Sequence, residues 1–201
     1  MIQQRLDTWV QDLSGNKLGI VKYFSYLYIR FILLKMKQFK EYTKMAKKYK
    51  VILISGGFDP VHKGHIECIQ NAKKLADEVW IGLNNDSWLR RKKGKSFMKE
   101  GERKFIMESL RDVDYVYVMN PLIHGDDTAI DFIDHAKHKW HSEKRGELEG
   151  NVAFGNGGDR TETTTPENDV CNSYGIDSVW GLGDKVQSSS WLLEKYLNIA
   201  E

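Results

Sequence analysis

The stretch "KVILISGGFDPVHKGH", residues 50–65, decides the fold of this chain. It opens with a run of apolar residues that predicts a buried strand. Gly56 and Gly57 follow directly; because neither has a Cβ atom, the backbone there can turn sharply and approach a ligand closely. Pro60 then restricts the chain just before a helical pattern that begins near Val61. The stretch therefore predicts a strand, a glycine turn and the start of a helix.

Two histidines lie at the start of that predicted helix. His62 and His65 are three residues apart, so we expect them on one face of the first turn, with Gly64 leaving space between them. The free backbone amides and the positive end of the helix dipole favour an anion at the same place. Imidazoles there can hydrogen-bond a phosphate and, when protonated, stabilise charge that grows on a phosphoryl group. Surface or capping histidines are the alternative interpretation. A zinc site is disfavoured because no third acidic or thiol ligand has a suitable spacing.

Beyond residue 65, short β-rich runs alternate with helical patterns. The runs lie at residues 78–84, 115–120, 151–156 and 177–183. Apolar residues between them recur at helical spacing, as at Ile66, Ile69, Ala72 and Leu75–Ala76, at Phe105, Ile106, Ser109 and Leu110, and at Ile130, Ile133 and Ala136. Strands separated by helices predict an α/β fold, here a Rossmann-like, doubly wound, mostly parallel sheet of five strands. Ligands of such sheets bind beyond the carboxyl ends of the strands.

The first part of the chain differs in composition from the rest. We expect an N-terminal helical extension over residues 1–49 and one domain over residues 50–201. Residues 18–34 are apolar and aromatic but contain two basic residues, and they match neither a spanning helix nor a signal peptide well. A packing helix that forms a homodimer is our interpretation. Contact with a membrane surface and a segment outside the natural functional chain are the alternatives.

Charge and cysteine content exclude several classes of protein. The chain has 30 basic and 28 acidic residues, a formal charge of +2, which gives no argument for a nucleic-acid partner. The lysine-rich residues 35–50 favour a solvated helix face over a nucleic-acid arm. Cys68 and Cys171 form neither a disulfide framework nor a zinc ligand set, so we expect a reducing, cytoplasmic setting.

At residues 54–65 the sequence resembles the nucleotidyltransferases that carry a His-x-Gly-His signature. The resemblance extends to about residue 197, and it is to the branch of heptose-1-phosphate adenylyltransferases and glycerol-3-phosphate cytidylyltransferases. It implies catalytic roles for four residues, which are His62, Lys63, His65 and Lys93. It also implies nucleotide contacts in the first loop by Gly56, Gly57, Phe58, Asp59 and Gly64.

Two later motifs extend the resemblance. The segment "GNGGDRTETTTPE", residues 155–167, resembles the fourth-strand loop that surrounds the base and ribose, which implies nucleotide contacts by Gly158, Asp159 and Arg160. The segment "KVQSSSWLLEKY", residues 185–196, resembles the serine/threonine motif that opens the last helix. Its hydroxyls, from Ser188, Ser189 and Ser190, lie beside free helix amides and suit β- and γ-phosphate oxygens. The same serines also suit a plain helix cap.

The middle of the chain resembles the second and third strands of the same branch. Residues 72–94 and 101–118 carry this likeness, which implies substrate contacts by Asn85, Asp86, Lys95 and Arg103. The basic loop at residues 90–95 suits closure over a triphosphate, and a solvated loop is its alternative. Four further histidines have no motif support, so we expect His124, His135, His138 and His141 at the surface. We also expect the polar connection at residues 137–151 to be exposed to solvent.

The resemblance implies an enzyme that joins the nucleoside monophosphate of ATP to a sugar 1-phosphate, heptose-1-phosphate-like, and releases pyrophosphate. Mg²⁺ would arrive with the nucleoside triphosphate, and we expect no residue that binds a metal by itself. A CTP-dependent glycerol-3-phosphate cytidylyltransferase and a non-catalytic nucleotide-binding or assembly protein are the alternatives. Nicotinate-mononucleotide and pantetheine-phosphate adenylyltransferases share the first motif but fit the later ones less well. The last motif reads Gln-Ser-Ser-Ser where many relatives have Ser-Thr-Thr, which leaves the choice of nucleotide open.

Overall fold

The computed structural model describes residues 27–33, 47–120, 128–184 and 188–197. The chain divides into two compact units, Met1–Ala46 and Lys47–Glu201. Residues 27–33 of the first unit form a helix whose large apolar side chains are exposed. No helix in these described ranges is long and apolar enough to cross a membrane. Most of the expected extension, and His124, lie outside the described residues, and the expected boundary after residue 49 stays a prediction.

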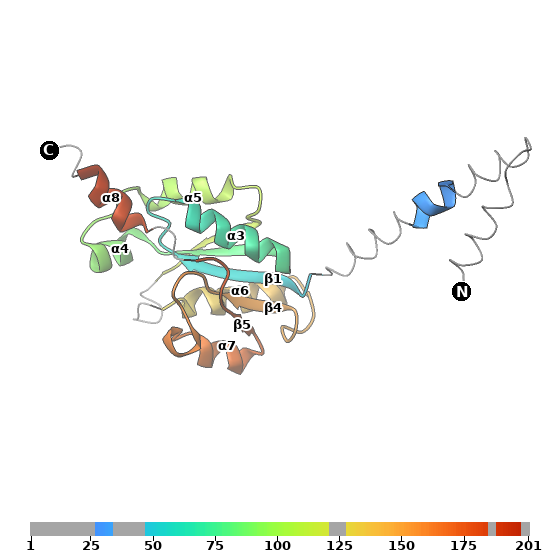
Figure 1. Ribbon diagram of the computed structural model, residues 1–201. Coiled ribbons are helices and arrows are strands. Elements are labelled where there is room, and N and C mark those ends of the chain that lie inside the picture. Colours follow the sequence, from blue (N-terminus) through green and yellow to red (C-terminus); the bar gives the residue numbers. More distant parts are fainter. Residues whose placement is uncertain (1–26, 34–46, 121–127, 185–187, 198–201) are drawn as a thin grey trace, which may run out of the picture. The chain divides into compact units, whose positions relative to one another are not determined.

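The second unit is built on five strands that form one parallel sheet (Figure 1). They are β1 (Tyr49–Gly56), β2 (Ala76–Leu83), β3 (Tyr115–Val118), β4 (Val152–Gly155) and β5 (Asp177–Val179). Their order in the sheet is β3-β2-β1-β4-β5. The expected Rossmann-like α/β fold is confirmed, and the sheet is parallel throughout rather than mostly parallel. The strand order reverses between β1 and β4, which is where such sheets open a crevice for ligands.

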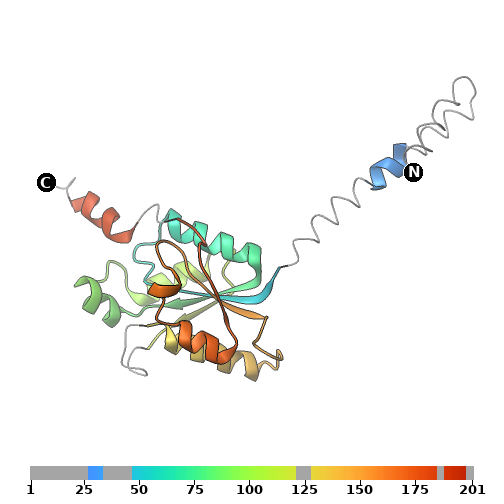
Figure 2. The same cartoon turned by 60° about the horizontal axis from the view of Figure 1, so that its bottom comes forward.

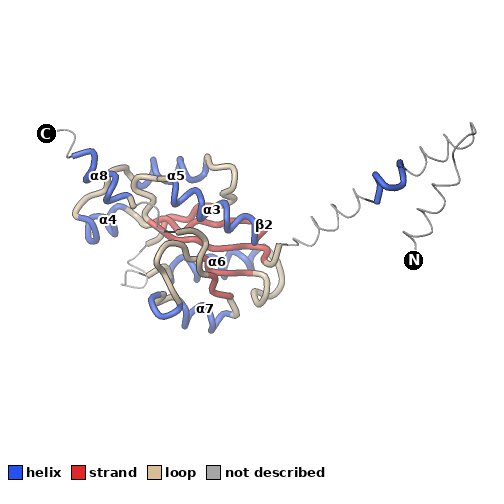
Figure 3. The backbone as a smooth tube through the Cα atoms, viewed as in Figure 1, coloured by secondary structure: helices blue, strands red, loops and turns tan. Residues whose placement is uncertain are grey.

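Helices separate the strands along the chain (Figure 3). They are α3 (Lys63–Leu75), α4 (Asp86–Lys93), α5 (Glu100–Glu108), α6 (Ile130–Ser142), α7 (Asn168–Tyr174) and α8 (Ser189–Leu197), with a 3₁₀ turn at Glu162–Thr164. The sheet lies between α3 and α5 on one face and α6 and α7 on the other (Figures 1 and 2). These two layers bury both faces of the central strand.

The apolar run of β1 explains the two layers. Successive side chains of a strand point to opposite faces, so a strand covered on both sides needs a continuous apolar run. Ile52 and Ile54 pack in the core under α3 and α5, whereas Val51 and Leu53 pack in the core against α6 and α7. All four have exposed fractions of 5% or less. The run quoted from the sequence therefore fixes the centre of the domain.

The inward face of α5 differs from the expected one. Phe105 is 72% exposed, whereas Arg103 and Met107 are fully buried. Met107 contributes to the core cluster beneath α3 and α5. Arg103 and Met107 are four residues apart and therefore share one face of the helix. The expectation that Phe105 faces the core was wrong because the apolar spacing there did not reveal that a buried arginine occupies that face.

The polar connection at residues 137–151 is also less exposed than expected. Trp140 and Leu148 are 2% and 7% exposed and belong to the core cluster under α6 and α7. The indole Nε1 of Trp140 donates to the carbonyl of Gly146 at 2.8 Å, which satisfies its polar atom in the core. The expectation of a fully solvated connection was therefore wrong.

His135 on α6 is not a plain surface residue either. Its ring stacks on that of Tyr117 at a centroid distance of 3.8 Å, and its Nε2 lies 2.8 Å from the hydroxyl of Tyr115. Burial lowers the pKa of His135, which Asp131 partly opposes. These contacts give the ring a structural role, because they fasten α6 to β3.

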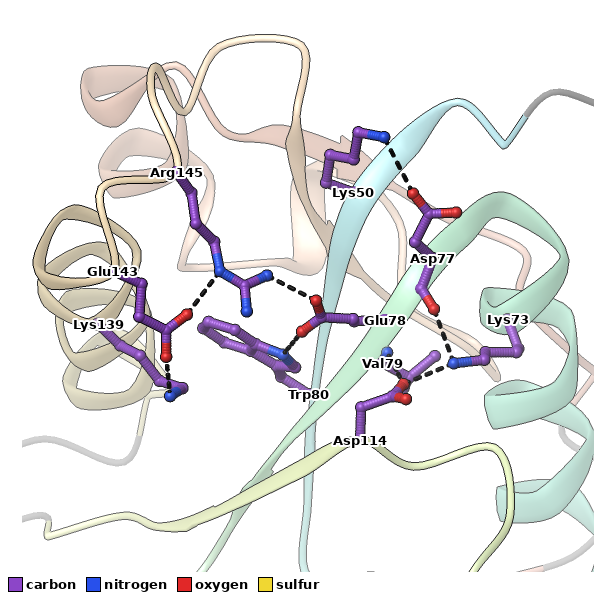
Figure 4. Close-up of polar contacts among 10 residues, drawn as sticks. All are labelled: Lys50, Lys73, Asp77, Glu78, Val79, Trp80, Asp114, Lys139, Glu143 and Arg145. Atoms are coloured by element: carbon purple, nitrogen blue, oxygen red, sulfur yellow. Dashed lines mark hydrogen bonds and ion pairs between the residues drawn. The ribbon is translucent and has the colours of Figure 1, made fainter.

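A network of charged residues lies at the amino-terminal ends of the strands (Figure 4). Arg145 donates to Glu78 at 2.6 Å and to Glu143 at 2.5 Å, and Glu78 also accepts from the indole of Trp80. Asp114 accepts from Lys73 at 2.6 Å. Partly exposed ion pairs of this kind contribute about 0–1 kcal/mol each. They join helices to strand ends at the edge opposite the site described next.

Candidate active site

A cavity of about 380 Å³ lies beyond the carboxyl ends of β1 and β4. Four segments enclose it: the end of β1, the start of α3, the loop after β4 and the start of α8. Eleven of the expected site residues line it, namely Gly56, Phe58, His62, Gly64, His65, Lys93, Gly158, Arg160, Ser188, Ser189 and Ser190. Residues up to 134 positions apart in the sequence thus meet in one crevice.

The two histidines form a stacked pair at the start of α3. His62 is the extended N-cap residue, so the helix begins at Lys63, slightly later than expected. The two rings are 3.7 Å apart between centroids, with an interplanar angle of 20°. The backbone N–H of His62 donates to Nδ1 of His65 at 3.3 Å. Neutral His65 therefore carries its proton on Nε2.

Burial sets the protonation of this pair. Desolvation lowers the pKa of His65 to about 3, and the charges of His62 and Lys93 act in the same direction. The pKa of His62 is lowered mainly by burial and further by Lys93. The protein alone therefore keeps both rings uncharged at neutral pH, in contrast to the protonated form considered from the sequence. Bound phosphate charge would raise both pKa values.

Lys93, the last residue of α4, supplies a cation to the same cavity. Partial burial lowers the pKa of its ammonium, and the nearby charge of Asp59 opposes that change. A lysine in such a place is a point charge suited to phosphate oxygens.

The start of α8 forms a second helix terminus on the cavity. Ser188 Oγ accepts from the backbone N–H of Trp191 at 3.2 Å, so the capping role of this serine is present. Ser189 Oγ donates to the carbonyl of Pro60 at 2.9 Å and joins α8 to the loop that precedes α3. Ser190 also lines the cavity. The first-turn amides of α8 lack partners within the helix and favour an anion, as those of α3 do.

The loop after β4 forms the opposite wall. Gly158 has a φ of 69°, a conformation that favours glycine, and its N–H donates to the carbonyl of Gly183 at 2.8 Å. Arg160 lines the cavity, and its Nη1 lies 3.2 Å from Oε2 of Glu167. Asp159 is exposed and does not line the cavity, so the expected nucleotide contact of its side chain lacks support from the geometry.

Asn156, on the same wall, is a residue that the sequence analysis missed. It is 5% exposed and lines the cavity directly after β4. Its backbone is fixed, because its N–H donates to Val179 at 2.7 Å and its carbonyl accepts from Leu182 at 3.2 Å. A polar residue immediately after a buried strand in a parallel sheet was the available signal.

Two buried side-chain nitrogens at this cavity have no hydrogen-bond partner. They are Nδ1 of His62 and Nδ2 of Asn156, the two such atoms found in the described part of the chain. A buried polar atom without a partner costs about 1–3 kcal/mol, so native structures rarely keep one without a reason. Both residues line one cavity, which indicates a site shaped for a polar ligand.

Arg103 does not reach the cavity. Its side chain is 0% exposed, and its guanidinium donates to the carbonyls of Gly57 at 2.8 Å and Asn84 at 2.7 Å. It also donates to the Met98 carbonyl at 3.1 Å and to the carboxylate of Asp86 at 2.8 Å. The expected direct contact with substrate is therefore replaced by a positioning role, because Arg103 fastens the loops after β1 and β2 to α5.

Asp59 and Asn85 are likewise occupied by the protein itself. Asp59 is 1% exposed, and its two carboxylate oxygens each accept a backbone N–H at 2.7 Å, from Phe97 and Met98. Asn85 Oδ1 accepts from the N–H of Trp88 at 2.9 Å and caps α4. Neither lines the cavity, so both position loops instead of contacting a ligand directly.

Lys63 and Lys95 also lie off the cavity. The Lys63 side chain is 73% exposed and pairs with Glu67 at 3.2 Å on the outer face of α3. Lys95 is exposed in the segment that follows α4. The geometry thus supports the expected catalytic role for Lys93 and not for Lys63.

The acidic residues present suit a metal that arrives with a phosphate ligand. In the described ranges, no group of three or more His, Cys, Asp or Glu side chains could hold a metal ion. Asp184 is the acidic side chain that lines the cavity. Mg²⁺ commonly binds through one or two carboxylates together with substrate phosphates, and this arrangement fits that pattern.

Comparison with known proteins agrees with this fold and site. Residues 53–122 match the model of the cytidylyltransferase-like family. A protein named "Bifunctional protein HldE" from Syntrophotalea carbinolica is 34% identical over 155 residues, which are 74% of this chain and 27% of that protein. Its namesake from Helicobacter pylori strain J99 is 40% identical over 97 residues, 47% of this chain and 20% of that protein. The chain thus spans about a quarter or less of the length of these relatives.

A solved structure shares the fold. It is a bifunctional NMN adenylyltransferase/ADP ribose pyrophosphatase from Francisella tularensis, complexed with AMP and a manganese ion, with a TM-score of 0.52 and 15% identity. The match covers 75% of this chain and 42% of that chain. The sheet and its crevice define a Rossmann-like nucleotide-binding fold. The chain belongs to the cytidylyltransferase-like branch of the nucleotidyltransferases.

Proposed function

We propose that this protein transfers a nucleoside monophosphate from a nucleoside triphosphate to a phosphorylated small molecule and releases pyrophosphate. One observation carries the proposal. The buried, unpartnered nitrogens of His62 and Asn156 lie on opposite walls of a cavity where two helices begin. Such a cavity offers donors to a polyanion along its whole length.

The reaction needs little covalent help from the protein. An oxygen of the acceptor phosphate attacks the α-phosphorus in line and forms a new P–O bond. The bond from the α-phosphorus to the bridging oxygen breaks, and pyrophosphate leaves with that electron pair. Positioning and charge stabilisation supply most of the lowering of the barrier in such transfers.

The chain's own groups divide this work. The Nε2–H of His65 donates to the phosphate at the reacting centre, with His62 stacked on it. Lys93 and the amides at the start of α8 stabilise the charge on the departing pyrophosphate. Asn156, Gly158 and Arg160 contact the nucleoside end. A bound Mg²⁺ would neutralise phosphate charge, with Asp184 as the side chain nearest to hand on the cavity wall.

We favour ATP and a heptose-1-phosphate-like sugar 1-phosphate as substrates. The resemblance of residues 155–167 to the loop of heptose-1-phosphate adenylyltransferases supports this choice. CTP with glycerol 3-phosphate is the second pairing. We also propose a homodimer, which sedimentation of the full chain tests: a single species at twice the chain mass of 23.3 kDa supports it, and a monomer contradicts it.

Pyrophosphate release tests the proposal. ATP and CTP are each combined with heptose 1-phosphate and with glycerol 3-phosphate in the presence of Mg²⁺. Release in one pairing that His65→Ala removes would support the transferase and identify its substrates. Silence in all four pairings, despite nucleotide binding, would contradict these substrates and favour a nucleotide-binding protein.

A further inference from the structure

A second cavity of about 240 Å³ adjoins the first. The two share Ser55, Gly56, Lys93 and Arg160 as walls. The rest of its lining comes from the other half of the sheet: the loop after β2, the helix α4, the end of β3 and the start of α6. The second cavity therefore opens beside the point where Lys93 and Arg160 face both spaces.

Asn84 is the residue that distinguishes this cavity. It is 9% exposed and lines the second cavity directly after β2. Its backbone is held on both sides, because its N–H donates to Gly56 at 2.9 Å and its carbonyl accepts from Arg103 at 2.7 Å. Its side-chain amide forms no hydrogen bond with any group in the described ranges. A buried amide on a fixed backbone is thus left for a ligand.

The two following residues differ from Asn84 in this respect. Asn85 caps α4, and Asp86 pairs with Arg103. Both side chains are therefore occupied, although the sequence favoured them as substrate contacts. The free amide lies one position earlier than expected.

A carboxylate completes the polar lining. Glu167 is 1% exposed and lines the second cavity. Its Oε1 accepts from the N–H of Ala129 at 2.8 Å, and its Oε2 lies 3.2 Å from Arg160. An ionised carboxylate has about four acceptor positions, so Glu167 retains capacity for hydroxyl donors. Trp88 supplies an apolar wall nearby.

We propose that the second cavity binds the acceptor, and that Asn84 recognises its hydroxyl groups. The class of ligand follows from the lining. Lys93 and Arg160 suit a phosphate at the shared wall, and an amide beside a carboxylate suits the hydroxyls of a sugar or polyol. Arg103 is then a positioning residue, since it holds the Asn84 backbone. This inference rests on the proposed transferase function.

Calorimetric titration at saturating nucleotide tests it without requiring turnover. The probes are heptose 1-phosphate and glycerol 3-phosphate, which carry hydroxyls, and methyl phosphate, which has none. Asn84→Ala should weaken binding of one hydroxylated probe about five- to tenfold, the usual effect of losing one hydrogen bond, and leave methyl phosphate unchanged. The control is Asn172→Ala, the same substitution at an exposed position on α7, which should bind all probes as the wild type does.

The outcomes separate this inference from the proposed function. Unchanged affinity of Asn84→Ala for the hydroxylated probes, or an equal loss for methyl phosphate, overturns hydroxyl recognition by Asn84. Failure of the wild-type protein to bind any of the three probes overturns the acceptor subsite. If the Asn84-dependent binding is observed but no pyrophosphate is released with either nucleotide, the subsite stands and the proposed transferase activity fails.

Discussion

The rings of His62 and His65 stack at 3.7 Å although one residue precedes α3 and the other belongs to its first turn. The backbone N–H of His62 donates to Nδ1 of His65 and fixes the second ring. Phe58 packs on the same ring at a centroid distance of 4.8 Å. This loop therefore presents the Nε2–H of His65 in one orientation.

His65→Asn tests that orientation. Asparagine keeps a side-chain acceptor for the N–H of His62 but removes the Nε2–H donor. We expect kcat to fall about 10²- to 10³-fold, as for the loss of one preorganised donor, with nucleotide affinity changed less than tenfold. Steady-state kinetics and calorimetry measure the two quantities. The control is His138→Asn, at an exposed position on α6, which should behave as the wild type.

The low pKa of His65, about 3, predicts a pH dependence of stability. The unfolded chain binds a proton near pH 6.5 and the folded chain does not, so the unfolded state binds more protons as the pH falls. Stability is therefore kept above about pH 6.5 and lost below it. Between pH 7 and pH 5 the wild-type protein should lose about 1–2 kcal/mol more than His65→Asn does. Urea unfolding at both pH values measures this, and parallel losses would argue against a neutral buried ring.

Arg103 predicts a stability effect without a direct role in substrate binding. Its guanidinium fork reaches three carbonyls and Asp86, which a single lysine ammonium cannot do. Arg103→Lys should cost roughly 3–5 kcal/mol of unfolding free energy. The matched change Arg111→Lys, at a side chain that is 89% exposed, should cost less than about 0.5 kcal/mol. Similar unfolding midpoints for both variants would refute the positioning role.

Asn156 predicts the opposite pattern. Its Nδ2 has no hydrogen bond to lose, so Asn156→Ala should leave the unfolding free energy within about 1 kcal/mol of the wild-type value. Nucleotide affinity should fall about three- to tenfold, because a ligand contact disappears. Thermal unfolding and calorimetry check the two halves. A large loss of stability with unchanged affinity would make Asn156 a structural residue.

The sequence was most informative where function and local structure coincide. The apolar run of β1, the glycine turn and the two histidines lie within sixteen consecutive residues, so the strand, the loop and the helix start were readable together. The serines of α8 were readable for the same reason, as a local cap motif.

The remaining site residues depend on partners distant in the sequence. Whether Asp59 faces a ligand or the 97–98 backbone is decided 38 and 39 residues away. Arg103 is buried by carbonyls 19 and 46 residues away, and that choice also decides which of Asn84, Asn85 and Asp86 keeps a free side chain. Local spacing carries no record of such contacts, which is why these roles were assigned to the wrong neighbours.

Phosphorus NMR of the complete reaction tests the central claim most directly. Wild-type protein with ATP, Mg²⁺ and heptose 1-phosphate should form equal amounts of pyrophosphate and a new diphosphate-linked conjugate, and His65→Ala should form neither. Substituting CTP and glycerol 3-phosphate covers the second pairing. Nucleotide that binds but stays intact with both acceptors, or that is hydrolysed without a conjugate, would contradict the account.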